Sequence, residues 1–345
     1  MMKNVVYTGI IPFNLINREK MTHRFVRAGW GALAAGLVTA SSAAEAQNAQ
    51  CLAQPLVARD ACQKVVDLFS YVAPSLGSMI TGGNATLGQI GSIGSTGHFS
   101  FGVRIVGMQT NLPQVQNLNF SATGPQQSNF PTKQQWAGFP TADVAVGLFP
   151  GVSLGAMRIA SVDALVNLAY VPKIKVGEDS IVVPHGSFKA GFGARVGLVD
   201  EDELRPAIAF TVLRRDLPTI GLSGGGLATN SGDSLFIDSL DIHTTSWRIT
   251  AGKHAGILGA VIGIGKDHYN SNASMHAVVP GSGTSAISVS QSVDRTNLFA
   301  DVNVLFLHAE VGRVSGSKVP TYNTFAGTDP SAGQTYFATG IRLGF

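Results

Sequence analysis

The sequence has little charge, little cysteine and, after residue 46, no long apolar run. Only 13% of its 345 residues are Asp, Glu, Lys or Arg, against about a quarter in ordinary soluble proteins. Its 41 glycines, together with many Ser, Thr and Asn residues, favour strands and turns over helices. The mean hydropathy is still positive, at +0.21, yet no later run of about 18 uncharged apolar residues can form a spanning helix. A membrane protein of this kind would have to cross with strands.

Residues 1–46 have the features of an export signal. Two arginines precede an uncharged stretch from Ala28 to Ala44, and Ala44-Glu45-Ala46 fits the small-x-small cleavage pattern. We expect cleavage after Ala46 and a mature chain that starts at Gln47, with Met21 as an alternative translation start. An uncleaved membrane anchor is the other interpretation, but the apolar core is short for one.

Cleavage removes most of the excess positive charge. Five of the 24 basic residues and two of the 21 acidic ones lie in residues 1–46, so 19 of each remain. The sequence pI of about 8.9 therefore belongs largely to the signal. No basic surface for nucleic acid is expected in the mature chain.

The two cysteines, Cys51 and Cys62, lie just after the predicted cleavage site. An exported chain reaches an oxidising compartment, where such a pair favours a local disulfide over a metal site. We predict that Cys51 and Cys62 are bonded to each other.

From residue 98 onwards, apolar residues alternate with small or polar ones. This period of two is expected of strands that face lipid on one side and a polar lumen on the other. A soluble β-sandwich also alternates, but its outer face would normally carry more charge. The count is about ten strands, with a range of eight to fourteen, and an even number returns the C-terminus to the periplasmic side. The clearest strands cover 99–105, 142–148, 188–198, 247–251, 298–304 and 337–345, and weaker ones cover 162–171, 206–214, 256–265 and 307–315.

The final strand carries the most specific signal. Five alternate residues from Phe337 to Phe345 share one face, and the chain stops at the aromatic residue. Residues 98–345 here resemble bacterial outer-membrane β-barrel proteins, whose last strand commonly ends in Phe and is recognised by the assembly machinery. The resemblance implies an all-β fold, a transmembrane antiparallel β-barrel in the bacterial outer membrane, with Phe345 as the assembly signal. It also implies outer-membrane lipids and the barrel assembly machinery as partners.

The connections alternate in length. Those near 150–151, 200–205 and 253–256 are short and are expected on the periplasmic side. The others are expected to be external loops, near 110–140, 216–241, 267–293 and 317–333.

The segment 47–97 differs from the rest of the chain. Asp60 and Gln63 can form a capping box, followed by a short amphipathic helix that ends near Pro74. A Gly- and Ser-rich stretch then leads to the first strand. This segment is either a periplasmic extension or a plug inside the barrel. A helix ahead of a barrel resembles the plugged layout of the long-chain fatty-acid transporter family, but that family's Asn-Pro-Ala pattern is replaced by Asn84-Ala85-Thr86, so none of its ligand-binding residues is assigned here.

Strand phase points eight charged side chains into the lumen. Buried charges need partners or water, so these residues either form salt bridges that fill the interior or line a wet pore. Glycines at inward positions leave space and favour the pore, which would be a passive channel or transporter for small solutes or hydrophobic molecules. A filled lumen would instead indicate a structural or adhesive surface barrel that displays its long loops. The predicted pore-lining residues are Arg104, Asp143, Asp163, Lys189, Arg195, Arg248, Asp301 and Arg342.

No residue pattern predicts catalysis or a cofactor. Ser153 and Ser223 lie in Gly-x-Ser-x-Gly motifs, but in a predicted turn and a predicted loop instead of between a strand and a helix. His243, His268 and His276 can converge at the external rim, without the spacing of metal ligands. We therefore expect neither an enzyme nor a metal site. A small-molecule or hydrophobic ligand remains the expected partner of a pore.

Overall fold

The computed structural model describes residues 47–155, 157–176, 179–225 and 232–345, which belong to one compact unit. The predicted signal and its cleavage site after Ala46 lie outside the described residues. In the described part of the chain, no helix is long and apolar enough to cross a membrane.

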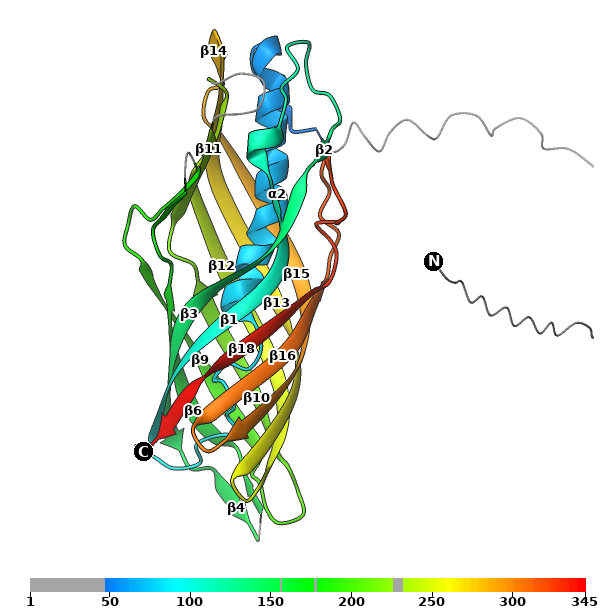
Figure 1. Cartoon of the computed structure of the whole chain (residues 1–345). Coiled ribbons are helices and arrows are strands. Elements are labelled where there is room, and N and C mark those ends of the chain that lie inside the picture. Colours follow the sequence, from blue (N-terminus) through cyan, green and yellow to red (C-terminus); the bar gives the residue numbers. More distant parts are fainter. Residues whose placement is uncertain (1–46, 156, 177–178, 226–231) are drawn as a thin grey trace, which may run out of the picture. The chain divides into compact units, whose positions relative to one another are not determined.

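Ten antiparallel strands close into a barrel, as the alternation predicted (Figure 1). Nine neighbouring pairs follow one another along the chain, and the last strand pairs back with the first. The strands, in order around the barrel, are β1 (Phe99–Pro113), β3 (Thr132–Phe149), β6 (Ser161–Tyr170), β9 (Phe188–Val199), β10 (Ala207–Asp216), β12 (Ser234–Ala255), β13 (Leu258–Val279), β15 (Ile287–Val304), β16 (Leu307–Gly316) and β18 (Gln334–Gly344).

The seam between β1 and β18 closes at the final residue. Phe99 donates its amide hydrogen to the carbonyl of Phe345 at 3.0 Å, and Phe345 returns the bond at 2.8 Å. The two rings stack with centroids 5.1 Å apart. The terminal phenylalanine is therefore part of the strand pairing. We call the end of the barrel that holds this seam the C-terminal end, and the opposite one the loop end.

The strands extend further toward the loop end than predicted. β12 and β13 have 22 residues each, about twice the 9–11 that a tilted strand needs to span a bilayer. The predicted loop 267–293 is wrong, since only residues 280–286 separate β13 from β15. The loops predicted at 110–140 and 216–241 likewise shorten to 114–131 and 217–233. These strand ends carry polar side chains on the outer face and apolar ones on the inner face. Their polar residues were therefore predicted to belong to loops.

Short elements decorate both ends of the barrel. At the loop end, β7 (Ile174–Val176), β8 (Asp179–Val182) and β11 (Ile220–Gly225) extend the sheet beside β12, and β14 (Ser282–Gly283) pairs with β13. There too, η2 (Val115–Asn117) follows β1, and β2 (Asn129–Phe130) pairs with β17 (Thr324–Phe325). At the C-terminal end, the β3–β6 connection holds a hairpin of β4 (Val152–Leu154) and β5 (Met157–Ile159). The turns predicted near 150 and 200 lie at this same end.

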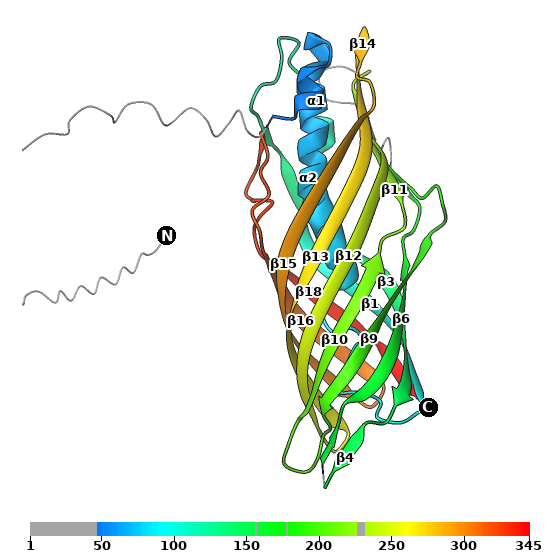
Figure 2. The ribbon, with the colours of Figure 1, turned by 180° about the vertical axis from the view of Figure 1, so that it is seen from behind.

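Helix α2 (Arg59–Thr81) lies against the inner faces of β12 and β13 (Figure 2). It was predicted to end near Pro74 but continues past it. Proline has no amide hydrogen to donate to the carbonyl of Ser70, and Nε2 of Gln291 donates to that carbonyl instead, at 3.3 Å. The predicted capping box is also wrong: the helix begins after Ala58, with no side-chain cap.

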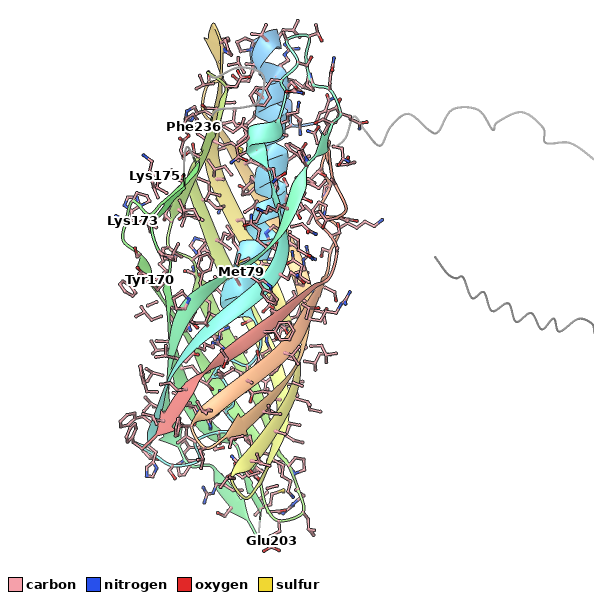
Figure 3. The ribbon with its side chains drawn as sticks, in the orientation of Figure 1. Met79, Tyr170, Lys173, Lys175, Glu203 and Phe236 are labelled. Carbon is pink, nitrogen blue, oxygen red and sulfur yellow. A yellow bond between two sulfur atoms is a disulfide. The ribbon has the colours of Figure 1, made fainter. Side chains whose placement is uncertain are left out.

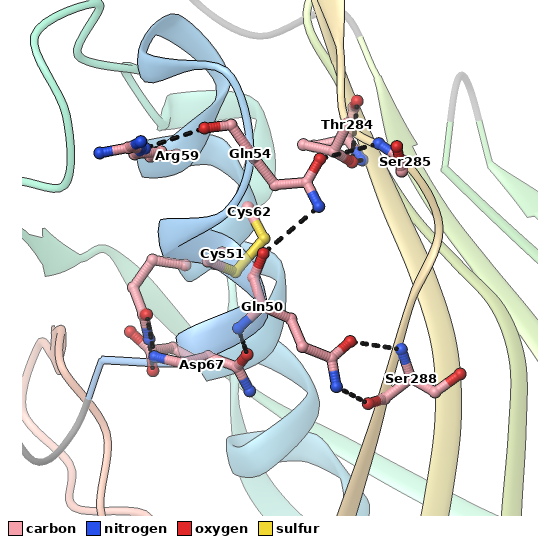
Figure 4. Close-up of a disulfide and its surroundings, with 12 residues drawn as sticks. Gln50, Cys51, Gln54, Arg59, Cys62, Asp67, Thr284, Ser285 and Ser288 are labelled. Atoms are coloured by element: carbon pink, nitrogen blue, oxygen red, sulfur yellow. Dashed lines mark hydrogen bonds between the residues drawn. A yellow bond between two sulfur atoms is a disulfide. The ribbon is translucent and has the colours of Figure 1, made fainter.

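The predicted disulfide between Cys51 and Cys62 is confirmed (Figure 4). It joins α1 (Ala49–Leu52) to α2 across the single turn η1 (Leu56–Ala58), and both cysteines are buried. Gln50 exchanges two hydrogen bonds with the backbone of Ser288, at 2.9 and 3.2 Å. Because Ser288 is the second residue of β15, Gln50 and α1 are fixed at the loop end.

The outer face carries an apolar band at the C-terminal half of the barrel. Its exposed side chains include Phe192 and Ile262. Aromatic pairs on its margin toward the loop end are Tyr170 with Phe188, Trp136 with Phe337 and Phe210 with Trp247. Figure 3 places Tyr170 at about the height of Met79, which lies near the end of α2. Most of α2 therefore lies beyond this band, in the part of the barrel that faces outward with polar side chains.

Candidate functional site

The lumen inside the apolar band is occupied by residues 82–97, which follow α2. A Cβ atom at Gly83 would lie 1.4 Å from Oε1 of Glu310, and one at Gly88 would lie 1.7 Å from Nδ1 of His308. Both glycines also have positive φ, at 73° and 66°, which other residues rarely adopt. The glycine-rich composition of this segment therefore allows its backbone to lie directly against the barrel wall.

Five arginines from five strands hold this segment, and we call them the arginine clasp. Arg104 donates to the carbonyl of Asn84 at 2.7 Å. Arg195 donates to the carbonyl of Gly91 at 3.3 Å and to the hydroxyl of Thr86. Four of the five are at most 2% exposed. The clasp consists of Arg104, Arg195, Arg215, Arg248 and Arg342.

Two clasp residues bind the end of α2. Arg215 donates to the carbonyls of Ile80, Thr81 and Ala85, at 3.3, 3.1 and 2.8 Å. Arg248 donates to Thr81 at 3.1 Å and to Gly83 at 3.0 Å. The last carbonyls of a helix have no partner within the helix and carry its negative dipole end, so cations are favoured there. The clasp thus satisfies the helix terminus that lies deepest in the barrel.

Buried carboxylates pair with three of the clasp residues. Arg104 lies 3.1 Å from Asp143, Arg195 lies 3.6 Å from Asp163, and Arg248 lies 2.6 Å from Asp267. All six side chains are nearly inaccessible to solvent. Breaking such a pair from one side leaves an uncompensated buried charge, which costs about 3–5 kcal/mol.

A second group of titratable side chains faces the segment from β15 and β16. Glu310 accepts a hydrogen bond from the amide of Asn84 at 2.8 Å. Asp301 is the cross-strand partner of Glu310, and Asn303 that of His308. Asn303 donates to the carbonyl of Gly88 at 3.3 Å. The wall therefore contacts the segment with arginine donors on one side, and with the carboxylate of Glu310 and the amide of Asn303 on this one.

The inner face becomes apolar around α2. Phe69, Met79 and Ile80 are buried in one cluster with inward residues of β12 and β13 such as Ile242 and Met275. Gly77 allows the ring of Tyr269 to approach, since a Cβ there would lie 2.7 Å from its Cδ1. Such packing makes α2 part of the hydrophobic core of the loop-end half.

Two buried aspartates of α2 organise the loops around it. Asp60 accepts from the amides of Ser121 and Gln126, at 2.8 and 2.9 Å. Asp67 accepts from the amide and side chain of Asn323, at 2.9 and 2.6 Å. Each aspartate therefore fixes one long loop, 114–131 or 317–333, to the helix.

The structure places the predicted pore-lining residues on the inner face. Arg104, Asp143, Asp163, Arg195, Arg248 and Asp301 are buried, while Lys189 and Arg342 are half-buried. The space that they surround holds residues 82–97, and Arg342 donates to Oε1 of Gln89 at 2.6 Å.

Sequence reasoning missed Arg215, Asp267, His308 and Glu310. The predicted strand ended one residue before Arg215, and Asp267 was assigned to a loop. His308 and Glu310 lie in a strand that was recognised only weakly. Continuing the period of two would have pointed all four inward.

The histidines and the motif serines do not form a catalytic or metal-binding set. His243, His268 and His276 each contact a different carboxylate, those of Asp216, Asp294 and Asp238. Ser223 shares a hydrogen bond of 2.7 Å with Ser180, and Ser153 lies in the hairpin strand β4. Among the described residues, no group of three or more His, Cys, Asp or Glu side chains could hold a metal ion.

Comparisons with known proteins identify no family. No protein-family model matches the chain, and no curated protein matches it either. Among solved structures, the outer membrane protein OpdK from Pseudomonas aeruginosa aligns with 72% of this chain and 99% of its own, at 9% identity and a TM-score of 0.16. The outer membrane protein OmpT of Vibrio cholerae, in its in-vitro folded trimer form, aligns with 73% and 100%, at 9% identity and a TM-score of 0.13. The pairing of the ten strands in this chain itself defines the barrel.

Proposed function

We propose that this chain is a bacterial outer-membrane barrel, closed by its own N-terminal segment, that serves as a structural or adhesive protein of the cell surface. The membrane location is supported by the apolar outer band with its aromatic margins. The connections are mostly short at the C-terminal end and longer at the loop end, the distribution of periplasmic turns and external loops in such barrels. The loop end then faces the outside of the cell.

The arginine clasp is the observation that supports a closed barrel. Hydrogen bonds from charged donors contribute about 1.5–3 kcal/mol each. The segment 82–97 could leave the lumen only if Arg104, Arg195, Arg215 and Arg248 gave up their contacts with backbone carbonyls. Passive diffusion through the resting barrel is therefore disfavoured. What the barrel offers to its surroundings is the loop end, where α2 and the long loops form one packed unit.

Planar-bilayer recording of the purified mature protein tests this function. Wild-type protein should insert without producing conductance steps. A double variant, Arg215→Gln with Arg248→Gln, removes the donors to the end of α2 and should give intermittent conductance. Steady conductance of the wild type would contradict the closed barrel.

A gated transporter is the second candidate. A pocket of about 520 Å³ opens at the C-terminal end between the segment and the wall, beside Gln89, His98 and Arg342. Such a vestibule could hold a small solute until the segment moves. Conductance of wild-type protein that appears only with an added solute would favour this candidate over the surface barrel.

The assembly signal is part of the same proposal. Phe345 is exposed on the outer face and pairs with the first strand through both backbone bonds. Deleting Phe345 should lower the yield of folded barrel, measured as loss of heat-modifiable mobility on gels. An unchanged yield would contradict its role as the signal.

A further inference from the structure

The apolar outer band ends along a sharp boundary on β10, β12, β13 and β15. Three successive rows of cross-strand partners cross this boundary, all on the outer face. The first row is apolar, the second is mixed and the third is polar. The outer face therefore changes from apolar to polar within four residues along each strand. The rows are Phe210-Ile249-Ile264-Leu298, then Val212-Trp247-Lys266-Thr296, then Arg214-Thr245-His268-Asp294.

A shallow groove of about 620 Å³ lies across this boundary. Its apolar side is formed by Phe210, Trp247 and Ile249, and its polar side by Lys266 and His268 with Asp294. The rings of Phe210 and Trp247 lie 6.5 Å apart. The groove therefore presents a hydrocarbon surface and a charged rim to one and the same occupant.

Two cations, two carboxylates and two histidines lie along the rim. Nζ of Lys266 lies 3.0 Å from Asp294, whose other oxygen contacts Nδ1 of His268 at 2.7 Å. One row further, Asp216 is shared by Arg214 at 3.3 Å and His243 at 3.1 Å. Lys266 and Arg214 are each about half exposed, and exposed ion pairs contribute little to stability. Both cations can therefore bind an added anion without loss of a strong interaction.

We propose that this groove binds a phosphorylated lipid of the outer leaflet. The phosphate would lie at Lys266 in the groove, within the reach of Arg214 from the next row on β10, and the acyl chains would follow Phe210, Trp247 and Ile249. A soluble phosphate would leave the apolar side of the groove unused, and a neutral lipid would leave the cations of the rim unused. Arg and Lys are the side chains that bind phosphate oxygens most strongly. The proposal relies on the outer-membrane location proposed above, because the groove lies on the loop-end margin of the band.

Binding of lipid A to the purified mature protein in zwitterionic detergent tests the proposal. Diphosphorylated lipid A and the same lipid after removal of its phosphates are compared through the fluorescence of Trp247, in protein whose other exposed tryptophan is removed by Trp136→Phe. The phosphorylated form should bind about tenfold more tightly. The double variant Lys266→Gln with Arg214→Gln should lose this preference. Arg313→Gln, which removes an exposed arginine on β16, is the matched control and should keep it.

Each outcome decides the proposal. Equal binding of the two lipid forms to wild-type protein overturns it, whether or not the variants fold. A double variant that folds and keeps the preference overturns the assignment of Lys266 and Arg214. Fractionation of cells separates this result from the location: a barrel found in the outer membrane that binds neither form contradicts the lipid site alone.

Discussion

Arg215 illustrates how a single buried charge is accommodated in this barrel. It lies within no salt bridge among the described residues, and its partners are the carbonyls of Ile80 and Thr81 at the end of α2 and that of Ala85 in the segment 82–97. The partial negative charge of a helix C-terminus can replace a carboxylate when the geometry brings several carbonyls together. Removal of α2 together with the segment 82–97 would therefore leave Arg215 without any of these partners, whereas Arg104, Arg195 and Arg248 would each keep a carboxylate.

Arg195→Glu should destabilise the barrel through its buried pair. Arg195 lies 3.6 Å from Asp163, and both side chains are at most 1% exposed, so the variant places two carboxylates together without solvent. Loss of a buried partner costs about 3–5 kcal/mol. The unfolding temperature should fall clearly in thermal melts.

Arg158→Glu is the matched control for this change. Arg158 also lies 3.6 Å from an aspartate, Asp200, and also donates to a glycine carbonyl, but its side chain is 45% exposed. Its effect should stay within about 1 kcal/mol. Equal destabilisation by the two variants would contradict the filled lumen at Arg195.

For single residues, the sequence predicts which face of the barrel a side chain points to, but it does not predict which groups the side chain binds there. The period of two placed Arg104, Arg195 and Arg248 on the inner face, because side chains alternate strictly along a strand. It could not indicate that each of them also donates to backbone carbonyls of residues 81–91, since these carry no side-chain signature. A charge paired with a carbonyl and a charge in a wet pore have the same sequence pattern.

At the scale of elements, α2 depends on contacts that lie far away in the sequence. The helix continues past Pro74 where Gln291 of β15 donates to the carbonyl that the proline leaves unbonded. Its buried carboxylates accept hydrogen bonds from loops between distant strands. The predicted helix therefore ended too early. Local signals such as proline and capping residues predict a helix only where tertiary contacts do not replace the missing bonds.

Asp67 should make the stability of the helix and its loop dependent on pH. Burial raises the pKa of Asp67 from 3.8 to about 6, although the amides of Asn323 and Tyr322 donate to it and lower the value. A raised pKa in the folded state means that the protonated form favours folding. This contribution is complete below about pH 4 and is lost as the pH rises through about 6.

The measurement compares thermal melts of wild-type protein and Asp67→Asn between pH 4 and pH 8. The wild type should lose stability relative to the variant across this range. Asp202→Asn is the control, because hydrogen bonds from Arg205 lower the pKa of the Asp202 carboxyl to about 2, below the window. Parallel curves for wild type and Asp67→Asn would show that Asp67 does not titrate there.

The disulfide should stabilise the same element. Cys51 and Cys62 are 11 residues apart, and closing so short a loop contributes about 2–3 kcal/mol in the chain-entropy model. Replacing both cysteines by alanine should lower the unfolding temperature and release α1 from the rim, which limited proteolysis detects. Free thiols in unreduced, exported protein would contradict the bond itself.

At the scale of the whole barrel, the sequence predicts the strand count better than the strand ends. Lipid contact imposes an apolar outer face within the band, so apolar residues alternate with small or polar ones along each strand there. Counting the segments with this alternation predicted about ten strands. Beyond the band, the apolar face turns inward to pack α2, as at Ile242 and Met275, while His268 and Asn270 face out. A rule that reads apolar residues as outward therefore fails where the barrel leaves the membrane.

The chain runs through the barrel from the loop end to the C-terminal end before it enters the first strand. Gln50 of α1 and Gln54 just after it accept hydrogen bonds from Ser288 and Ser285 at the loop end. The segment 82–97 descends through the lumen, and β1 begins beside Phe345 at the C-terminal end. Asn48 and Phe345 should therefore lie on opposite sides of the outer membrane. An epitope placed directly before Asn48 should be labelled by antibody on intact cells, whereas one placed after Phe345 or in the turn 256–257 should be labelled only after the membrane is broken. Labelling of both ends from the same side would exclude a chain that runs through the barrel.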